Sequence, residues 1–212
     1  MYSCILMDLD GTLTDPGEGI TNSIMYSLEK LGIIEKDRSR LYRFIGPPLM
    51  EELRAVYHLS EQEGLDALAY YREYFSVTGL FENEVYEGIP EVLGKIRDAG
   101  KKLIVATSKP EIYTKRILEH FDLEKYFDYV AGSTMDSSRV QKSDVIAYAM
   151  NNTGFSPEEA LMVGDRKNDI EGAAANGIRS VGVLYGYGSY EELSKAGADY
   201  YAKTPEEILY FI

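Results

Sequence analysis

Short apolar runs of β-forming residues recur along the 212-residue sequence, and helical patterns separate the last four of these runs. Strands that alternate with helices in this way are typical of βαβ units built around a parallel sheet. The five predicted strands lie at residues 4–9, 103–106, 129–131, 161–163 and 180–184. The sequence therefore predicts an α/β fold, with a parallel sheet that carries helices on both faces.

Residues 15–85 interrupt this alternation, because they carry helical patterns without a convincing strand. The helical segments are expected at about 20–31, 38–57 and 61–77. Proline prevents a continuous helix through Gly46-Pro47-Pro48, which breaks the second segment. We therefore predict a Rossmann-like α/β core formed by residues 1–14 and 86–212, and an inserted α-helical domain formed by residues 15–85.

Composition limits the classes of function that this fold can serve. The formal net charge of −13 would repel a phosphate backbone, which argues against nucleic-acid binding. The single cysteine, Cys4, lies in an apolar run, so a disulfide framework is excluded and a reducing compartment is favoured. No apolar stretch of about 18 residues and no basic leader is visible, so neither a membrane span nor a secretory signal is expected. We expect a cytoplasmic monomer or homodimer.

Two pairs of aspartates directly follow predicted strands. Asp8 and Asp10 come after the first strand, and Asp165 and Asp169 come after the strand at 161–163. Ligand sites in parallel sheets lie at the carboxyl ends of the strands, so we expect the four carboxylates to converge there. Such a group would raise the pKa of each member unless a cation neutralised it, and oxygen ligands favour Mg²⁺. Zinc is disfavoured, because the two histidines lack metal-ligand spacing.

Further polar residues are suited to holding a phosphate group. Thr107 and Ser108 follow the strand at 103–106, and Lys142 precedes a helical pattern. Hydroxyl groups and an ammonium group both bind phosphate oxygens. Taken singly, Thr107 is equally compatible with a helix cap or a turn, and Lys142 with a solvated surface position.

The order of these motifs resembles the phosphatase branch of the haloacid dehalogenase superfamily. Asp-Leu-Asp-Gly-Thr at 8–12, then Thr107-Ser108, then Lys142, then Gly-Asp-Arg-x-x-Asp at 164–169 correspond to its four motifs in order. The helical insertion at 15–85 lies where that superfamily places a cap domain. The resemblance covers most of the chain.

The resemblance implies a role for each motif residue. Asp8 would be the nucleophile, and Asp10 the general acid and base. The substrate phosphate would be bound by Thr107, Ser108 and Lys142. The metal site would be formed by Asp8, Asp10, Asp165 and Asp169. The reaction implied is hydrolysis of a small phosphomonoester through an aspartyl phosphate, with Mg²⁺ as cofactor and a small-molecule phosphate ester as substrate.

The branches of the superfamily differ at a few positions. Dehalogenases lack the second aspartate of the first motif, so Asp10 favours phosphoryl chemistry. Sugar phosphomutases resemble the phosphatases but carry a histidine early in the cap, where this sequence has Ile20-Thr21-Asn22. Phosphonate hydrolases use a cap lysine in an apolar pocket, and neither Lys30 nor Lys36 has such surroundings in the sequence. A mutase and a non-enzymatic domain that binds a phosphorylated ligand remain as alternatives.

Within the phosphatases, residues 43–49 and 185–189 are similar to the phosphoglycolate phosphatase group, which includes nucleotidases and pyrophosphatases. The resemblance therefore implies a phosphoglycolate-like substrate or a nucleoside 5′-monophosphate. The cap would select the leaving group by closing over it, as lids do in other enzymes. We expect its specificity residues to include Arg43, Gly46 and Leu49.

Overall fold

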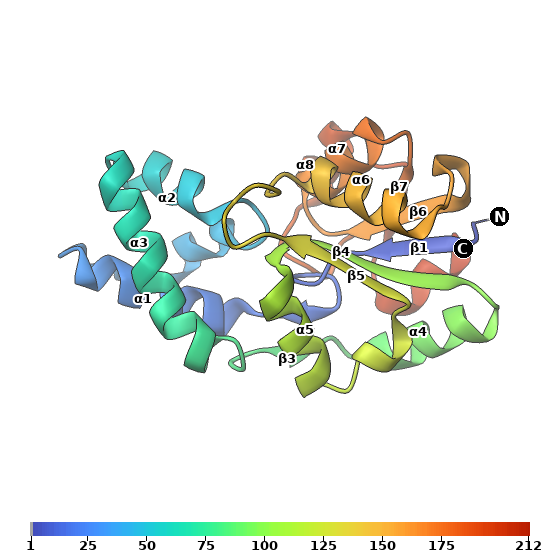
Figure 1. The fold of residues 1–212 in the computed structure, drawn as a ribbon, viewed down its shortest axis with the longest axis horizontal. Coiled ribbons are helices and arrows are strands. Elements are labelled where there is room, and N and C mark those ends of the chain that lie inside the picture. Colours follow the sequence, from blue (N-terminus) through green and yellow to red (C-terminus); the bar gives the residue numbers. More distant parts are fainter. Residues whose placement is uncertain (1) are drawn as a thin grey trace. The chain divides into compact units, whose positions relative to one another are not determined.

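The computed structural model describes residues 2–212, and its core is a six-stranded sheet in which every neighbouring pair of strands is parallel (Figure 1). The strand order is β5-β4-β1-β6-β7-β8. The strands are β1 (Cys4–Met7), β4 (Lys102–Pro110), β5 (Tyr129–Ser133), β6 (Ala160–Gly164), β7 (Arg179–Val183) and β8 (Tyr200–Ala202). This arrangement confirms the predicted α/β fold with a parallel sheet.

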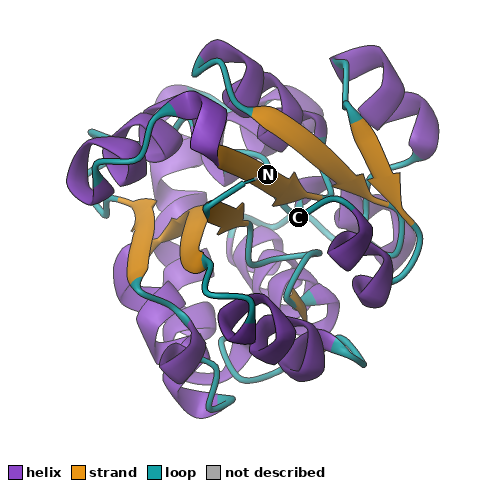
Figure 2. Cartoon of the chain, turned by 90° about the vertical axis from the view of Figure 1, so that its right-hand side faces the viewer, coloured by secondary structure: helices purple, strands orange, loops and turns teal. Residues whose placement is uncertain are grey.

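Helices cover both faces of this sheet, as Figure 2 shows with the helices in purple and the strands in orange. In Figure 1, α6, α7 and α8 lie on one side of the strands, and α4 and α5 lie on the other. The five helices are α4 (Ile89–Asp98), α5 (Glu111–His120), α6 (Lys142–Thr153), α7 (Lys167–Ala175) and α8 (Tyr190–Ala196). Short 3₁₀ helices are found at Glu124–Tyr126, Pro157–Glu159 and Pro205–Tyr210. No helix within residues 2–212 has the length and apolarity needed to cross a membrane.

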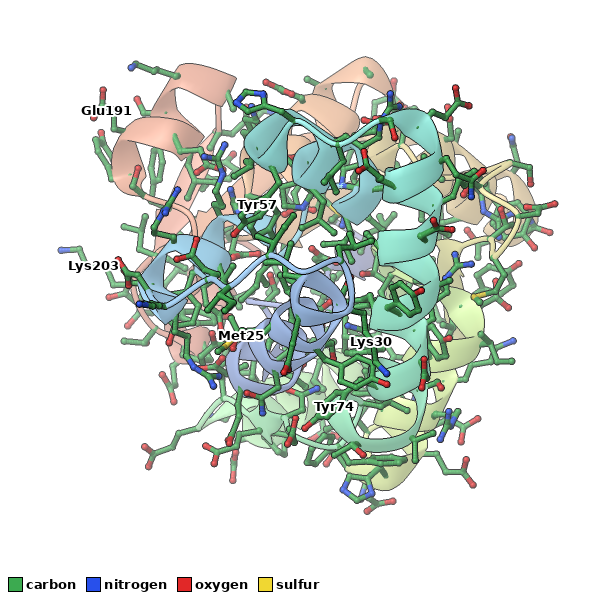
Figure 3. All side chains as sticks on the ribbon, turned by 90° about the vertical axis from the view of Figure 1, so that its left-hand side faces the viewer. Met25, Lys30, Tyr57, Tyr74, Glu191 and Lys203 are labelled. Carbon is green, nitrogen blue, oxygen red and sulfur yellow. The ribbon has the colours of Figure 1, made fainter. Side chains whose placement is uncertain are left out.

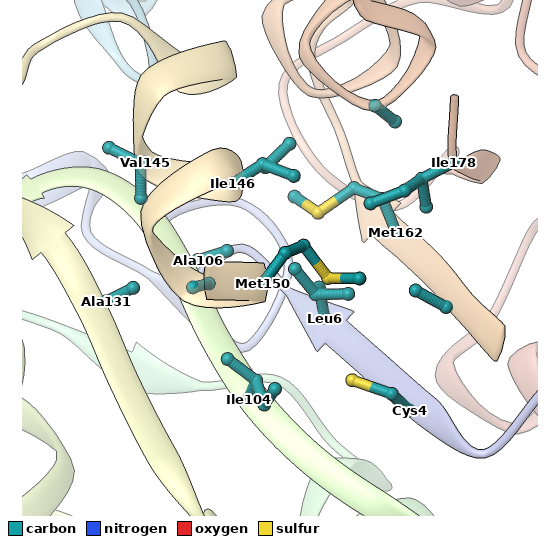
Figure 4. Packing of buried hydrophobic residues seen from close by; sticks show 13 residues of the cluster. Cys4, Leu6, Ile104, Ala106, Ala131, Val145, Ile146, Met150, Met162 and Ile178 are labelled. Atoms are coloured by element: carbon teal, nitrogen blue, oxygen red, sulfur yellow. The ribbon is translucent and has the colours of Figure 1, made fainter. Parts of the chain in front are cut away.

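The core on the α6 and α7 side is built from alternate residues of the strands. Cys4 and Leu6 of β1 pack there with Ile146 and Met150 of α6 and Met162 of β6 (Figure 4). The intervening β1 residues are fully buried as well, because helices also cover the opposite face. Burial raises the pKa of the Cys4 thiol to about 12, so Cys4 behaves as a small apolar core residue.

The observed strand ends differ from the predicted ones for local reasons. The first strand ends at Met7 rather than at Leu9, because the Leu9 carbonyl accepts turn hydrogen bonds from the amides of Leu13 and Thr14 at 2.8 and 3.0 Å. Strand β4, which was predicted at residues 103–106, continues to Pro110, and its pairing to β5 shifts between Ala106 and Pro110. The three-residue β8 was not predicted, because such a short run carries no clear alternation.

The chain divides into two compact units, Met1–Thr14 with Val85–Ile212, and Asp15–Glu84. The second boundary lies one residue before the predicted one. The second unit contains α1 (Gly17–Lys30), a 3₁₀ helix (Arg38–Phe44), α2 (Leu49–Tyr57), α3 (Glu61–Tyr74) and a π-helical turn (Phe75–Gly79). A two-stranded sheet of β2 (Thr14–Asp15) and β3 (Glu84–Val85) marks the two points at which the chain passes between the units.

A local cap and a contact between aromatic side chains stabilise helices of the second unit. Helix α3 begins with a capping box, in which the Ser60 amide donates to Glu63 Oε2 at 2.8 Å and the Glu63 amide donates to the Ser60 hydroxyl at 3.3 Å. On α1, the Nζ atom of Lys30 lies 5.1 Å from the centre of the Tyr26 ring, and that ring packs against Tyr74 of α3 (Figure 3). These contacts join α1 to α3 within the helical unit.

Candidate active site

The register of the sheet brings the ends of three strands together. Met7, the last residue of β1, pairs with Val105 of β4 on one side and with Val163 of β6 on the other. The Asp8 amide then donates to the Val163 carbonyl at 2.9 Å. Side chains that follow these three positions therefore meet at one edge of the sheet, as the spacing of the motifs predicts.

Asp8, Asp165 and Asp169 form a group that could hold a metal ion, because each offers a carboxylate oxygen and these oxygens lie within 4.8 Å of one another. All three side chains are buried. Burial, together with the charges of Asp169 and Asp8, raises the pKa of Asp165 well above its usual value. Burial and the Asp8 charge raise the pKa of Asp169 to about 6, although Lys142 opposes this shift. The ionised forms of Asp165 and Asp169 are therefore disfavoured in the absence of a bound cation.

Asp165 and Asp169 are each held by one backbone amide. Asp165 Oδ2 accepts a hydrogen bond from the Tyr187 amide at 2.8 Å, and Asp169 Oδ2 accepts one from the Arg166 amide at 3.0 Å. The second oxygen of Asp165, Oδ1, is buried and has no hydrogen-bond partner within residues 2–212. A buried carboxylate oxygen without a donor is costly, and a bound cation would satisfy it.

Lys142, the first residue of α6, is the cation that the structure places among these carboxylates. Its Nζ atom lies 2.9 Å from Asp8 Oδ1 and 2.7 Å from Asp169 Oδ1, and it donates a hydrogen bond to the Ala106 carbonyl at 3.1 Å. The side chain is almost fully buried, which acts to lower its pKa, but the charges of Asp169 and Asp8 raise the pKa above the usual value. Lys142 is therefore a fixed ammonium group and not a solvated surface lysine.

Asp10 lies outside the group of three carboxylates and pairs with Lys109. The Lys109 Nζ atom donates to Asp10 Oδ2 at 2.6 Å, and both side chains are buried. Asp10 Oδ1 is buried without a hydrogen-bond partner among the described residues. Burial raises the pKa of Asp10, while Lys109 acts to lower it. A carboxyl group with a raised pKa is suited to transferring protons.

Lys109 was missed by the sequence analysis, although it lies directly after Thr107 and Ser108. Thr107 is buried, and its hydroxyl accepts a hydrogen bond from the Lys109 amide at 3.2 Å, while Ser108 is half-buried. The only sequence signal for Lys109 was its position beside these two residues. The segment 107–109 therefore presents two hydroxyl groups and one ammonium group at the end of β4.

The loop after β7 surrounds Asp165 with glycines. A side chain at Gly186 would collide with the Gly11 carbonyl and the Asp165 side chain, and one at Gly188 would collide with the Asp165 carbonyl. Gly11 itself has a φ of 81° and also faces the Asp165 carboxylate. Residues 185–189 were singled out in the sequence only for their similarity to one group of phosphatases, so their contact with the Asp165 carboxylate was missed.

The three candidate specificity residues lie in the helical unit. The Arg43 side chain is exposed, and its Nη2 atom lies 3.5 Å from Glu52 Oε2. Gly46 has a φ of 101°, and Leu49 is the half-buried first residue of α2. In the same unit, the Arg38 guanidinium donates to Thr21 Oγ1 at 2.6 Å and to Asn22 Oδ1 at 2.7 Å.

Comparisons with known proteins show which family the chain resembles. Residues 5–183 match the family described as haloacid dehalogenase-like hydrolase. A 5′-nucleotidase of Pseudomonas aeruginosa is 46% identical over 192 residues, which cover 91% of this chain and 87% of that protein. A protein of Mycobacterium tuberculosis named tyrosine-protein kinase PtkA is 41% identical over 191 residues, which cover 90% of this chain but only 65% of the relative. The crystal structure of a predicted phosphatase from Clostridium acetobutylicum is 48% identical, with a TM-score of 0.96, and the match covers 98% of this chain and 96% of that one.

The chain belongs to the haloacid dehalogenase-like hydrolase family. This confirms the family predicted from the order of the four motifs. Its similarity to phosphatases along almost its whole length makes it a phosphatase of that family, an enzyme that hydrolyses phosphate monoesters.

Proposed function

We propose that this phosphatase requires Mg²⁺ and hydrolyses nucleoside 5′-monophosphates through a phosphorylated Asp8. The observation that carries the proposal is the group of three buried carboxylates with Lys142 between two of them. This arrangement combines a candidate nucleophile, a metal site and a fixed cation in one place. Few other reactions require all three.

The charges and the free oxygen of the group fit a divalent cation. The three ionised carboxylates share one ammonium group, so two negative charges remain, and Asp165 Oδ1 has no donor among the described residues. Asp8, Asp165 and Asp169 would hold the ion. Oxygen ligands without nitrogen or sulfur favour Mg²⁺ over transition metals. When bound, Mg²⁺ neutralises charge on the phosphoryl oxygens of the substrate.

The first step is assigned to Asp8. The ion pair with Lys142 and a hydrogen bond from the Leu9 amide fix the orientation of its carboxylate before substrate arrives. A carboxylate oxygen of Asp8 attacks phosphorus, and the bond between phosphorus and the ester oxygen breaks. Asp10 gives its proton to the departing oxygen. Lys142 and the hydroxyl groups of Thr107 and Ser108 stabilise the charge on the transferred group.

The second step regenerates the enzyme. Water attacks phosphorus of the aspartyl phosphate, and Asp10 takes a proton from that water. The bond between phosphorus and Asp8 breaks, which releases inorganic phosphate and the free carboxylate. Lys109 holds Asp10 through one oxygen, so the other oxygen, Oδ1, remains for proton transfer.

The nucleotide substrate is supported by the similarity to the 5′-nucleotidase. We assign selection of the leaving group to the helical unit Asp15–Glu84, which would act as a cap, and within it to Arg43, Gly46 and Leu49. The unit carries none of the residues assigned to the chemistry. Its sequence is therefore able to vary with the substrate.

The proposal is tested by measuring phosphate release from a panel of esters with Mg²⁺ and with chelator. We expect nucleoside 5′-monophosphates to be hydrolysed at least about tenfold faster than phosphoglycolate and sugar phosphates, since polar recognition of a leaving group gives discrimination of that order or more. Isomerised sugar phosphate without phosphate release would indicate a mutase. Transfer of phosphate from ATP to a tyrosine-containing peptide would contradict hydrolysis as the main reaction.

The assignment of selectivity to the helical unit gives a separate prediction. Arg43→Ala and Leu49→Ala should change the relative rates among natural substrates by about threefold to tenfold, because contacts to a leaving group are lost. Both variants should leave p-nitrophenyl phosphate hydrolysis within about twofold of wild type. Arg40→Ala is the matched control, because Arg40 is another exposed arginine of the same 3₁₀ helix. Equal losses across the whole panel would refute the assignment.

A further inference from the structure

Tyr185 connects three parts of the α/β unit that are distant in the sequence. It lies two residues after the end of β7, and its hydroxyl donates a hydrogen bond to the Thr12 carbonyl at 3.0 Å. Its ring packs edge-on against Tyr86, with the ring centres 5.1 Å apart and the planes at 67°. Burial raises the pKa of Tyr185 well above its usual value, so the hydroxyl remains a donor at neutral pH.

Both contacts of Tyr185 lie where the chain leaves and re-enters the α/β unit. Thr12 lies two residues before β2, and Tyr86 directly follows β3. The Tyr86 amide donates to the Leu13 carbonyl at 3.1 Å, so the outgoing and returning segments are also bonded to each other. Tyr185, which follows strand β7, therefore contacts both the outgoing and the returning segment.

The residues that follow Tyr185 hold Asp165. Gly186 lies against the Gly11 carbonyl and the Asp165 side chain, and the Tyr187 amide donates to Asp165 Oδ2 at 2.8 Å. Only two peptide bonds separate Tyr185 from the amide that orients this carboxylate. A shift of Tyr185 would therefore move the donor to Asp165, because Gly186 has no room to absorb the change on that side.

We propose that Tyr185 is a positioning residue for the metal site, which orients Asp165 through the Tyr187 amide and joins that carboxylate to the two segments that connect the units. The inference rests on the proposed Mg²⁺ site. It assigns to a residue outside the four motifs a control over metal affinity. It also predicts that the connecting segments respond when the metal binds.

The first test measures Mg²⁺ affinity by isothermal titration calorimetry. Tyr185→Phe keeps the ring against Tyr86 but removes the hydrogen bond to Thr12, and we expect its dissociation constant for Mg²⁺ to rise by roughly threefold to tenfold. Groups that orient metal ligands typically change affinity by about 10- to 100-fold, and Tyr185 acts one step further away. Tyr190→Phe is the matched control, because this exposed tyrosine has no hydroxyl hydrogen bond within the described residues.

The second test uses fluorescence, because the chain contains no tryptophan. Tyr86→Trp places a single tryptophan at the returning segment, and its emission should change with Mg²⁺ over the concentration range that calorimetry gives. Adding Tyr185→Phe should reduce the amplitude at least about twofold. This readout also serves if Tyr185→Phe alone folds poorly, since the Mg²⁺ response of Tyr86→Trp by itself tests the link.

The outcomes separate the inference from the proposed function. If wild type binds no Mg²⁺, the proposed function fails. If wild type binds Mg²⁺ and hydrolyses phosphate esters, while Tyr185→Phe binds Mg²⁺ as tightly as Tyr190→Phe does, only the inference is overturned. Lower thermal stability with unchanged Mg²⁺ affinity would indicate that Tyr185 has a purely structural role. Emission of Tyr86→Trp that ignores Mg²⁺ would exclude the link to the connecting segments.

Discussion

Asp8→Asn is expected to abolish covalent phosphorylation of the protein and to lower turnover by on the order of 10⁴-fold or more, as loss of a nucleophile does in other enzymes. The asparagine keeps the shape of the side chain but lacks the carboxylate oxygen that attacks phosphorus and the negative charge that pairs with Lys142. Asp98→Asn, at an exposed position on α4, is the matched control and should retain wild-type activity.

Asp10→Asn should behave differently, because Asp10 is assigned to proton transfer. With p-nitrophenyl phosphate the leaving group scarcely needs a proton, so the enzyme should still be phosphorylated. The phosphoenzyme should then be hydrolysed about 10²–10⁴-fold more slowly, since water has lost its base. Rapid mixing should show a burst of nitrophenol near one equivalent of enzyme for Asp10→Asn and none for Asp8→Asn. A burst from Asp8→Asn would overturn the assignment of the nucleophile.

Much of the site follows from the sequence, because side chains that come directly after parallel strands must meet at one edge of the sheet. This reasoning brings Asp8 and Asp165 together, whereas Lys142 was assigned to the same site only through the order of the four motifs. The helical character of residues 15–85 was equally accessible, since it depends on local periodicity.

Other features depend on tertiary contacts that a single sequence does not display. Lys109 pairs with Asp10 from the irregular end of β4, where the pairing to β5 shifts. The Tyr187 amide donates to Asp165 from the backbone, so no side-chain type marks it. The four aspartates were expected to form one metal site. In the structure Asp10 Oδ2 pairs with Lys109, while Asp8, Asp165 and Asp169 form a group that could hold a metal ion.

Loss of the metal site should also lower activity strongly, and the raised pKa values of the carboxylates should make Mg²⁺ binding depend on pH. Asp165→Asn removes one of the three carboxylates of the group, so Mg²⁺ affinity should fall at least about 100-fold and activity should fall with it. Wild type should lose activity in chelator and recover it with Mg²⁺. Full turnover in chelator, or wild-type Mg²⁺ affinity in Asp165→Asn, would contradict the assignment of the site.

Burial raises the pKa of both Asp165 and Asp169, the latter to about 6, so the metal-free group competes for protons with Mg²⁺. Binding of Mg²⁺ should therefore release protons and become tighter as the pH rises through about 6.

The stability of the metal-free protein should change with pH in the opposite direction to its Mg²⁺ affinity. A carboxyl group with a raised pKa in the folded state stabilises the metal-free protein below its unfolded pKa of about 4, and this contribution is lost as the pH rises through the folded pKa, which is about 6 for Asp169 and is also raised for Asp165. In chelator, the free energy of unfolding of wild type should thus fall relative to that of Asp165→Asn as the pH rises above about 4, because the variant lacks the Asp165 carboxyl group. Saturating Mg²⁺ should offset this fall in wild type but not in the variant, because only the intact group gains binding energy from the ion. Denaturant titrations of both proteins at pH 5 and pH 7, with Mg²⁺ and with chelator, measure the free energy of unfolding under each of these conditions. A wild-type protein whose stability at pH 7 ignores Mg²⁺ would show that the three carboxylates do not form the site.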